Sequence, residues 1–170
     1  VITVNGVSKG FAMTGWRVGF IGAPLWIAKA CNKIQGQVTS ATCAIAQKAT
    51  EEAMKAEPKS VTNNMRKSFF NRRDLLLKKL NEIKGVKCNI PDGAFYIFPD
   101  VSYFHGKTDG KIKINNSDDL CMYLLNSCYV ALVSGAPFGN PECVRISYAA
   151  SEEKLIEAVK RIKIQLEKLY

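Results

Sequence analysis

The chain has 170 residues, of which 47% are hydrophobic and 23% are charged, and its mean hydropathy is close to zero. This composition excludes disordered, collagen-like and coiled-coil proteins, and a folded chain of this length can bury a real core. The net charge of +9 permits binding to nucleic acid or to an anionic membrane. Because acidic residues mix with the basic ones on the expected helices, and no aromatic residues are interleaved with them, we interpret this charge as solvated helix faces.

Other sequence features disfavour further classes of protein. No apolar run approaches the roughly 18 residues of a membrane-spanning helix, and the start of the chain lacks the pattern of a secretory signal. The six cysteines form no C-x-x-C pair and His105 is the only histidine, which argues against a zinc site. We therefore expect a cytoplasmic protein with no metal and no nucleic-acid or membrane partner. Residues 1–4 have the pattern of a strand entered without a leader, which favours a fragment of a longer protein.

The first part of the chain predicts strands and helices of an α/β domain. The expected elements are strands over 1–5 and 17–22, and helices from Pro24, over 41–56 and from Pro58. After Pro24, apolar residues recur at helical spacing, namely Trp26, Ile27, Ala30 and Ile34. We predict that residues 1–72 form the C-terminal part of a large α/β domain and that the helix from Pro58 connects this domain to a second one.

The pattern changes after Gly85, where short strands alternate with turns and two helices. The expected strands cover 86–90, 94–98, 129–133 and 143–147. Ser117 and Ser151 are expected to cap one helix each, and Asp118 and Asp119 suit the first turn of the former. This order of elements predicts a small α+β domain over residues 73–170.

Residues 6–19 read GVSKGFAMTGWRVG and carry the densest chemical information in the chain. Lys9 lies in a glycine-rich loop among small and apolar residues, which favour the neutral amine that attack on an aldehyde requires. Arg17 offers the planar, bidentate hydrogen bonds that suit a phosphate. From these residues alone, an ordinary loop lysine and an ordinary surface arginine remain the more common explanation.

This segment resembles the cofactor-lysine signature of class I aminotransferases that depend on pyridoxal 5'-phosphate, and specifically their aspartate aminotransferase branch common in bacteria. The matching positions are Gly6, Val7, Ser8, Lys9, Arg17, Val18 and Gly19. A second stretch, residues 143–149, resembles the late strand of that family, whose arginine holds the substrate α-carboxylate. Residues 91–96 and 135–139 also resemble family segments, so the likeness covers the whole chain in the right order.

The resemblance implies the C-terminal part of a fold type I transferase and a role for each matching residue. Lys9 would form the Schiff base with the cofactor and move a proton, Arg17 would bind the cofactor phosphate, and Ser8 would add a second phosphate contact. Arg145 would bind the substrate α-carboxylate, for which a bidentate guanidinium is suited. The implied reaction is transamination between an L-amino acid and a 2-oxo acid, with aspartate or glutamate as the expected amino acid. The intact enzyme is implied to be a homodimer. Residues 1–170 alone would be incomplete for catalysis.

Two other functions remain open from the sequence. Another enzyme of the same fold and cofactor, a β-lyase or an acyl-condensing synthase, would share Lys9 and Arg17. A non-catalytic binding or assembly module would leave Lys9 without a role. Dependence of turnover on a 2-oxo acid separates transamination from the first alternative, and a cofactor chromophore that requires Lys9 excludes the second.

Overall fold

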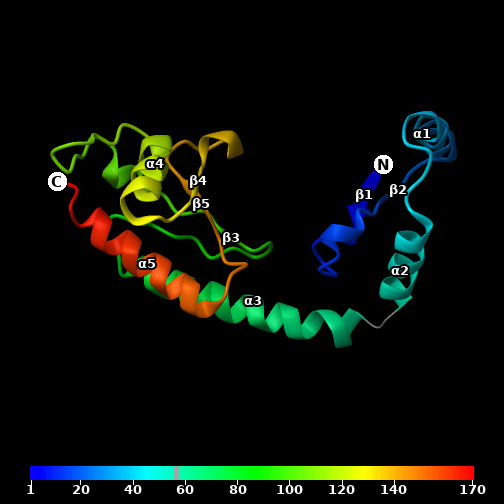
Figure 1. Ribbon diagram of the computed structural model, residues 1–170, viewed down its shortest axis with the longest axis horizontal. Coiled ribbons are helices and arrows are strands. Elements are labelled where there is room, and N and C mark those ends of the chain that lie inside the picture. Colours follow the sequence, from blue (N-terminus) through cyan, green and yellow to red (C-terminus); the bar gives the residue numbers. More distant parts are fainter. Residues whose placement is uncertain (56–57) are drawn as a thin grey trace. The chain divides into compact units, whose positions relative to one another are not determined.

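The computed structural model describes residues 1–55 and 58–170, and the chain divides into two compact units, Val1–Arg66 and Lys67–Tyr170 (Figure 1). In the first unit, strands β1 (Thr3–Gly6) and β2 (Gly19–Gly22) form an antiparallel pair. Helices α1 (Leu25–Val38) and α2 (Ala44–Lys55) come next along the chain. These elements lie where the strand and helix patterns predicted them.

The core of the first unit is formed by the loop between β1 and β2 together with α2. Its buried residues are Val7, Met13, Val18 and Ala46. The apolar residues of α1 take no part in it, since Trp26 is 74% exposed and Ile34 64% exposed. The apolar residues of α1 therefore recur at helical spacing as predicted, but the described residues do not bury them.

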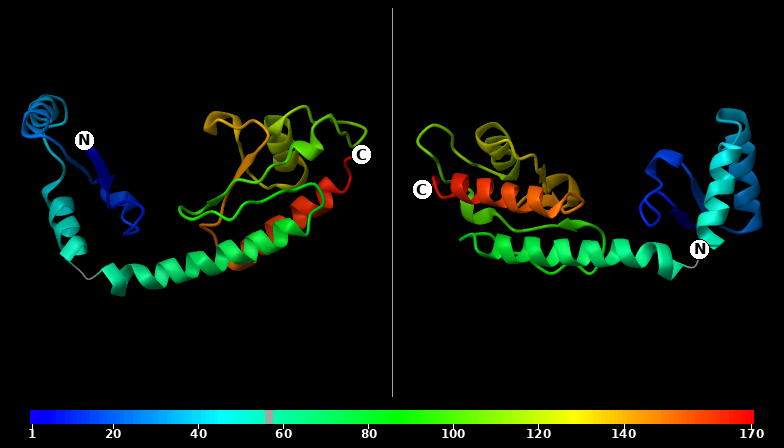
Figure 2. Two further views of the ribbon diagram at one scale, coloured as in Figure 1. Left: turned by 180° about the vertical axis from the view of Figure 1, so that it is seen from behind. Right: turned by 60° about the horizontal axis from the view of Figure 1, so that its bottom comes forward.

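The second unit is a three-stranded antiparallel sheet packed against helices. Strands β3 (Tyr96–Ile97), β5 (Val144–Ser147) and β4 (Val133–Ser134) lie in that order, with β5 in the middle. The long helix α3 (Pro58–Asn81) spans the division between the units, and α4 (Ser117–Cys128) and α5 (Glu152–Leu166) pack against each other (Figure 2). Residues 73–170, which are predicted to form a small α+β domain, thus contain both strands and helices.

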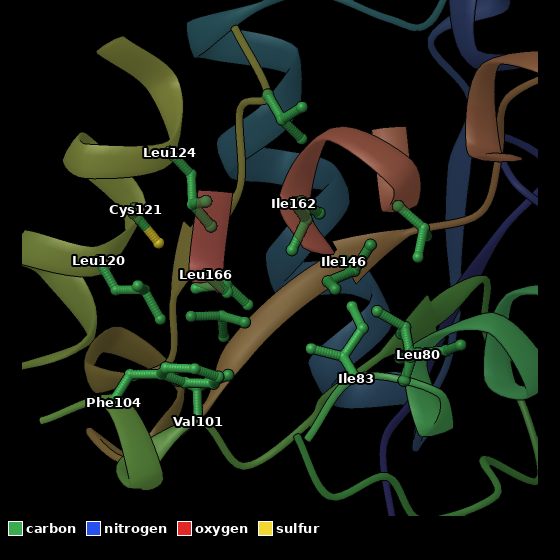
Figure 3. Packing of buried hydrophobic residues seen from close by; sticks show 14 of the residues in the cluster. Leu80, Ile83, Val101, Phe104, Leu120, Cys121, Leu124, Ile146, Ile162 and Leu166 are labelled. Atoms are coloured by element: carbon green, nitrogen blue, oxygen red, sulfur yellow. The ribbon is translucent and has the colours of Figure 1, made fainter. Parts of the chain in front are cut away.

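One face of this sheet is covered by the main hydrophobic core. Ile97 is fully buried and Val144 almost so, and both point to the core side of their strands. Figure 3 shows side chains from α3, the loop after it, α4, β5 and α5 meeting there. They include Leu80, Ile83, Leu120, Leu124, Ile146, Ile162 and Leu166. Burial also raises the pKa of the Cys121 thiol to about 11, so this cysteine behaves as a small apolar side chain.

Two predicted strands are corrected by the structure. Residues 86–90 form only one isolated bridge, between Lys87 and Asp100, rather than a ladder of paired residues. The strand predicted over 129–133 begins only at Val133. Tyr129 instead ends α4 in the left-handed conformation, with φ of 58°, and its N–H donates to the helix carbonyls.

The helix caps also differ in part from the prediction. Asn116, and not Ser117, caps α4, because its side-chain oxygen accepts from the Asp119 N–H at 2.9 Å. Ser117 lies inside the helix, where its hydroxyl bonds that of Ser134 at 2.9 Å in the core. At α5 the prediction is confirmed, since the Ser151 side chain accepts from the Lys154 N–H. Among the described residues, no helix is long and apolar enough to cross a membrane.

Candidate active site

The loop that carries Lys9 is coiled by its own backbone hydrogen bonds. The Phe11 N–H donates to the Val7 carbonyl at 3.2 Å, and the Ala12 N–H donates to the Lys9 carbonyl at 3.3 Å. A short 3-10 turn, Thr14–Trp16, continues the coil. The segment between the two strands is therefore a series of tight turns rather than an extended loop.

Apolar anchors decide which side chains of this loop face outward. Val7 is 1% exposed, and Met13 and Val18 are each 9% exposed. Between these anchors, Lys9 and Arg17 are exposed and Ser8 is half-buried. The loop thus holds an amine, a hydroxyl and a guanidinium on a frame that is fixed by burial on its inner side.

Arg17 is further fixed by its backbone. Its φ of 57° and ψ of 48° lie in the left-handed region, which costs a residue with a side chain about 1–2 kcal/mol. Such strained residues concentrate at functional sites. The Nη1 atom donates to the Thr14 carbonyl at 2.9 Å. Within the described part of the chain this is the only hydrogen bond of the guanidinium, which has five N–H donors.

A cavity of about 650 Å³ adjoins Arg17 within the first unit. Trp16 and Arg17 line it from the loop, and Gln35 lines it from α1. The segment that enters α2 adds Thr39 and Thr42. Of the predicted site residues on the loop, Arg17 lines this cavity, whereas Ser8 and Lys9 are not among its lining residues.

Gly6 lies where the two strands approach each other closely at the start of the loop. It pairs with Gly19 across the two strands, and a Cβ at position 6 would lie 3.0 Å from the Val18 carbonyl oxygen. By contrast, a Cβ at Gly10 or Gly15 would meet no atom within 4 Å. The close approach at Gly6 is therefore to the neighbouring strand, whereas the later glycines leave open space beside the loop.

Arg145 lies on the middle strand of the second unit, on the face opposite the core. Its neighbours Val144 and Ile146 are buried, so the strand alternation turns Arg145 the other way. Its guanidinium carbon lies 4.5 Å from the ring centre of Tyr96 and 4.3 Å from that of Phe138. The sequence analysis assigned a role to Arg145 but to neither ring, although both rings lie in segments that resemble the family, residues 91–96 and 135–139.

Three of the four predicted site residues lie in the same unit. Ser8, Lys9 and Arg17 share one loop of the first unit, whereas Arg145 belongs to the second unit. No group of His, Cys, Asp or Glu side chains among residues 1–55 and 58–170 is arranged to hold a metal ion.

The chain thus presents an exposed lysine and an exposed arginine on one loop of the first unit, and a half-buried arginine on a strand of the second unit. Residues 1–162 match the family described as aminotransferase class I and II, and the chain belongs to this family.

Particular relatives narrow the comparison. The chain is 52% identical over 165 residues to a bifunctional aspartate aminotransferase and glutamate/aspartate-prephenate aminotransferase of Petunia hybrida, covering 95% of this chain and 34% of that protein. The crystal structure of an aspartate aminotransferase of Rhizobium meliloti matches with a TM-score of 0.94 and 42% identity, over 99% of this chain and 42% of that one. An aromatic aminotransferase of Pyrococcus horikoshii matches with a TM-score of 0.86 and 40% identity, over 98% of this chain and 43% of that one.

These likenesses confirm the predicted fold class. The chain has the fold of the C-terminal part of a fold type I transferase, a mixture of helices and sheet that its relatives share. It spans between 34% and 43% of the length of these three relatives.

Proposed function

We propose that this chain supplies cofactor-binding and substrate-binding residues of an aminotransferase that exchanges amino groups between aspartate or glutamate and a 2-oxo acid. The observation that carries the proposal is the anchored loop, which exposes both Lys9 and Arg17 and holds a half-buried Ser8 hydroxyl. The names of the Petunia and Rhizobium relatives support aspartate as a substrate. The name of the Pyrococcus relative supports aromatic amino acids as the competing class of substrate.

The donors on the loop fit pyridoxal 5'-phosphate. A primary amine suits its aldehyde, and a guanidinium with four further N–H donors suits its phosphate. Bound at Lys9, the cofactor supplies an electron sink for negative charge that develops on the substrate Cα. Lys9 would hold the cofactor and, when released, accept and return the Cα proton at Nζ. Arg17 and Ser8 would bind the phosphate and keep the cofactor oriented.

Arg145 would recognise what all substrates of such an enzyme share. Amino acids and 2-oxo acids both carry a carboxylate next to the reacting carbon, and a planar guanidinium binds it through two parallel hydrogen bonds. This contact orients the substrate without reading its side chain. The choice between aspartate, glutamate and aromatic substrates therefore depends on residues other than Arg145.

We also propose the wider organisation that the family resemblance implies. The active protein would be a homodimer, with residues 1–72 in the large domain and 73–170 in the small one. Its location would be the cytoplasm, where buried thiols such as Cys121 and Cys143 stay reduced.

The test uses the natural protein that contains these 170 residues, incubated with aspartate and 2-oxoglutarate. We expect glutamate and oxaloacetate to form, and the protein to show a cofactor absorbance band at roughly 360–430 nm. Borohydride reduction should abolish this band and leave the cofactor covalently attached to Lys9. Lys9→Ala should abolish both, while Lys29→Ala, which removes an exposed lysine of α1, should change neither.

The other outcomes decide between the alternatives. Turnover of the amino acid without any 2-oxo acid would contradict transamination and favour another enzyme with the same cofactor. A protein with neither band nor turnover, unaffected by Lys9→Ala, would contradict the proposal and favour a non-catalytic module.

A further inference from the structure

Among the residues that the structure describes, Arg145 has aromatic rings beside it and no acidic partner. Tyr96 and Phe98 alternate along the chain at β3 and turn to the same face as Arg145, because Ile97 between them is fully buried on the core side. Tyr96 pairs directly with Ser147, two residues from Arg145 on the same face of β5. The Phe138 ring meets the Phe98 ring edge-on at 6.3 Å, so a third ring packs against one of the two rings that contact the guanidinium.

Arg145 differs in this respect from Arg73 and Arg161 of the same unit. Arg72 also has a ring nearby, that of Phe69 at 5.7 Å, and makes no ion pair among the described residues. Arg73 also lies over a ring, that of Phe70, but it donates to the Asp74 carboxylate at 2.8 Å. Arg161 donates to the Glu157 carboxylate at 2.8 Å. Within the described part of the chain, Arg145 makes no ion pair and no side-chain hydrogen bond. A contact with a ring face attracts the cation without using any of its N–H donors, which stay available to a ligand.

Phe138 is held against Arg145 by the geometry of its loop. The Phe138 N–H donates to the Gly135 carbonyl at 2.8 Å, and the Gly139 N–H donates to the Ala136 carbonyl at 3.1 Å. Gly139 then reverses the chain with φ of +85°, which favours glycine. The ring remains 48% exposed, so its burial alone does not explain its place. An exposed aromatic residue fixed by a tight turn over a half-buried arginine indicates a positioning role.

We propose that Tyr96 and Phe138 are positioning residues that clamp the Arg145 guanidinium from two sides and hold it ready for the substrate carboxylate. This inference rests on the proposed function, since it deepens the role given there to Arg145. A carboxylate partner within the protein would position an arginine as well, but it would occupy the donors that the substrate needs. The two rings fix the arginine while leaving its charge and its donors for the ligand.

The clamp predicts a defined kinetic effect. The α-carboxylate is present in both substrates, so loss of one ring should raise KM for the amino acid and for the 2-oxo acid alike. A cation–π contact of ordinary strength corresponds to a roughly three- to ten-fold change in affinity. The rate constant kcat should stay within about two-fold, because Lys9 and its loop are unchanged.

The experiment compares Phe138→Leu with Phe138→Tyr in the natural protein that contains this chain. We expect Phe138→Leu to raise both KM values and Phe138→Tyr, which keeps the ring, to restore them. Phe70→Leu is the matched control, since it removes an exposed ring from under another arginine of the same unit. Tyr96→Leu provides the same test from the other side of the clamp if Phe138→Leu fails to fold.

A second readout tracks Arg145 without turnover. In protein labelled with ¹⁵N-arginine, the Nε–H signal of Arg145 should show a rigid side chain in the unmodified protein and a mobile one in Phe138→Leu. Unchanged KM values together with an unchanged Arg145 signal would overturn the clamp while leaving transamination intact. An unmodified protein without amino-group exchange would instead contradict the proposed function, and the NMR measurement would still decide whether the rings order Arg145.

Discussion

Gly135→Ala is the substitution whose cost is most directly determined by the structure. The φ of Gly135 is −79° and its ψ is −15°, a conformation that alanine adopts freely, so the backbone angles carry no penalty. The obstacle is space, because an added Cβ would overlap the carbonyl oxygens of Asn140 and Cys143. Both obstacles are backbone atoms, which cannot rotate away as a flexible side chain would.

The magnitude can be worked out from the hydrogen bonds that converge on this turn. The Gly135 N–H donates to the Cys143 carbonyl at 2.8 Å, and the Gly135 carbonyl accepts from Phe138 at 2.8 Å and from Asn140 at 3.2 Å. Relieving the overlap means separating the two sides of the turn, which breaks at least two of these bonds. At about 1 kcal/mol for each, the expected loss in the free energy of unfolding is about 2–3 kcal/mol.

Urea unfolding monitored by far-UV circular dichroism measures this loss, and hydrogen exchange of residues 133–147 locates it. Gly93→Ala is the matched control in the same unit, because a Cβ at position 93 would meet no atom within 4 Å. It should change the free energy of unfolding by less than about 0.5 kcal/mol. A Gly135→Ala protein as stable as the Gly93→Ala protein would refute the steric reasoning.

Two further substitutions test the second unit. Tyr148→Phe removes the hydroxyl that donates to the Ala94 carbonyl at 2.9 Å, and should lower the free energy of unfolding by about 0.5–1.5 kcal/mol in urea titrations. Hydrogen bonds from the Ser102 hydroxyl and N–H hold the pKa of the Asp100 carboxyl below its usual value. Its contribution is therefore present above about pH 4 and is lost as pH falls through the lowered pKa. The stability difference between the unmodified protein and Asp100→Asn should shrink below that pH, and a constant difference in acid titrations would contradict this assignment.

Local signals in the sequence predicted the helices well. The cap at Ser151 and the apolar spacing after it are properties of adjacent residues, and they place α5 correctly. The left-handed end of α4 at Tyr129 was missed, because an aromatic residue before apolar neighbours also fits a strand. Residues 86–90 fit a strand equally well, but their pairing depends on distant residues, and only Lys87 forms a bridge.

The candidate site shows the same limit. The spacing of Lys9 and Arg17 is local, and the resemblance assigned both residues from one continuous segment. The left-handed backbone of Arg17 is not readable from that segment, because glycine, and not arginine, is the residue that such a conformation favours. The rings around Arg145 lie in segments that resemble the family, but their contact with Arg145 was not predicted, for a topological reason. Tyr96 and Phe138 reach it only after β3 pairs with β5 and the turn before β5 closes.

The absence of a carboxylate partner among the described residues does not by itself distinguish Arg17 and Arg145 from other cations. The chain has 24 basic residues and 15 acidic ones, so basic residues exceed the possible acidic partners. The difference lies in how these two are held. Arg17 is fixed by a strained backbone and a bond to its own turn, and Arg145 by a central strand and two rings. Both arrangements fix a guanidinium without neutralising it, which is the physical requirement for binding a phosphate or a carboxylate from outside the protein.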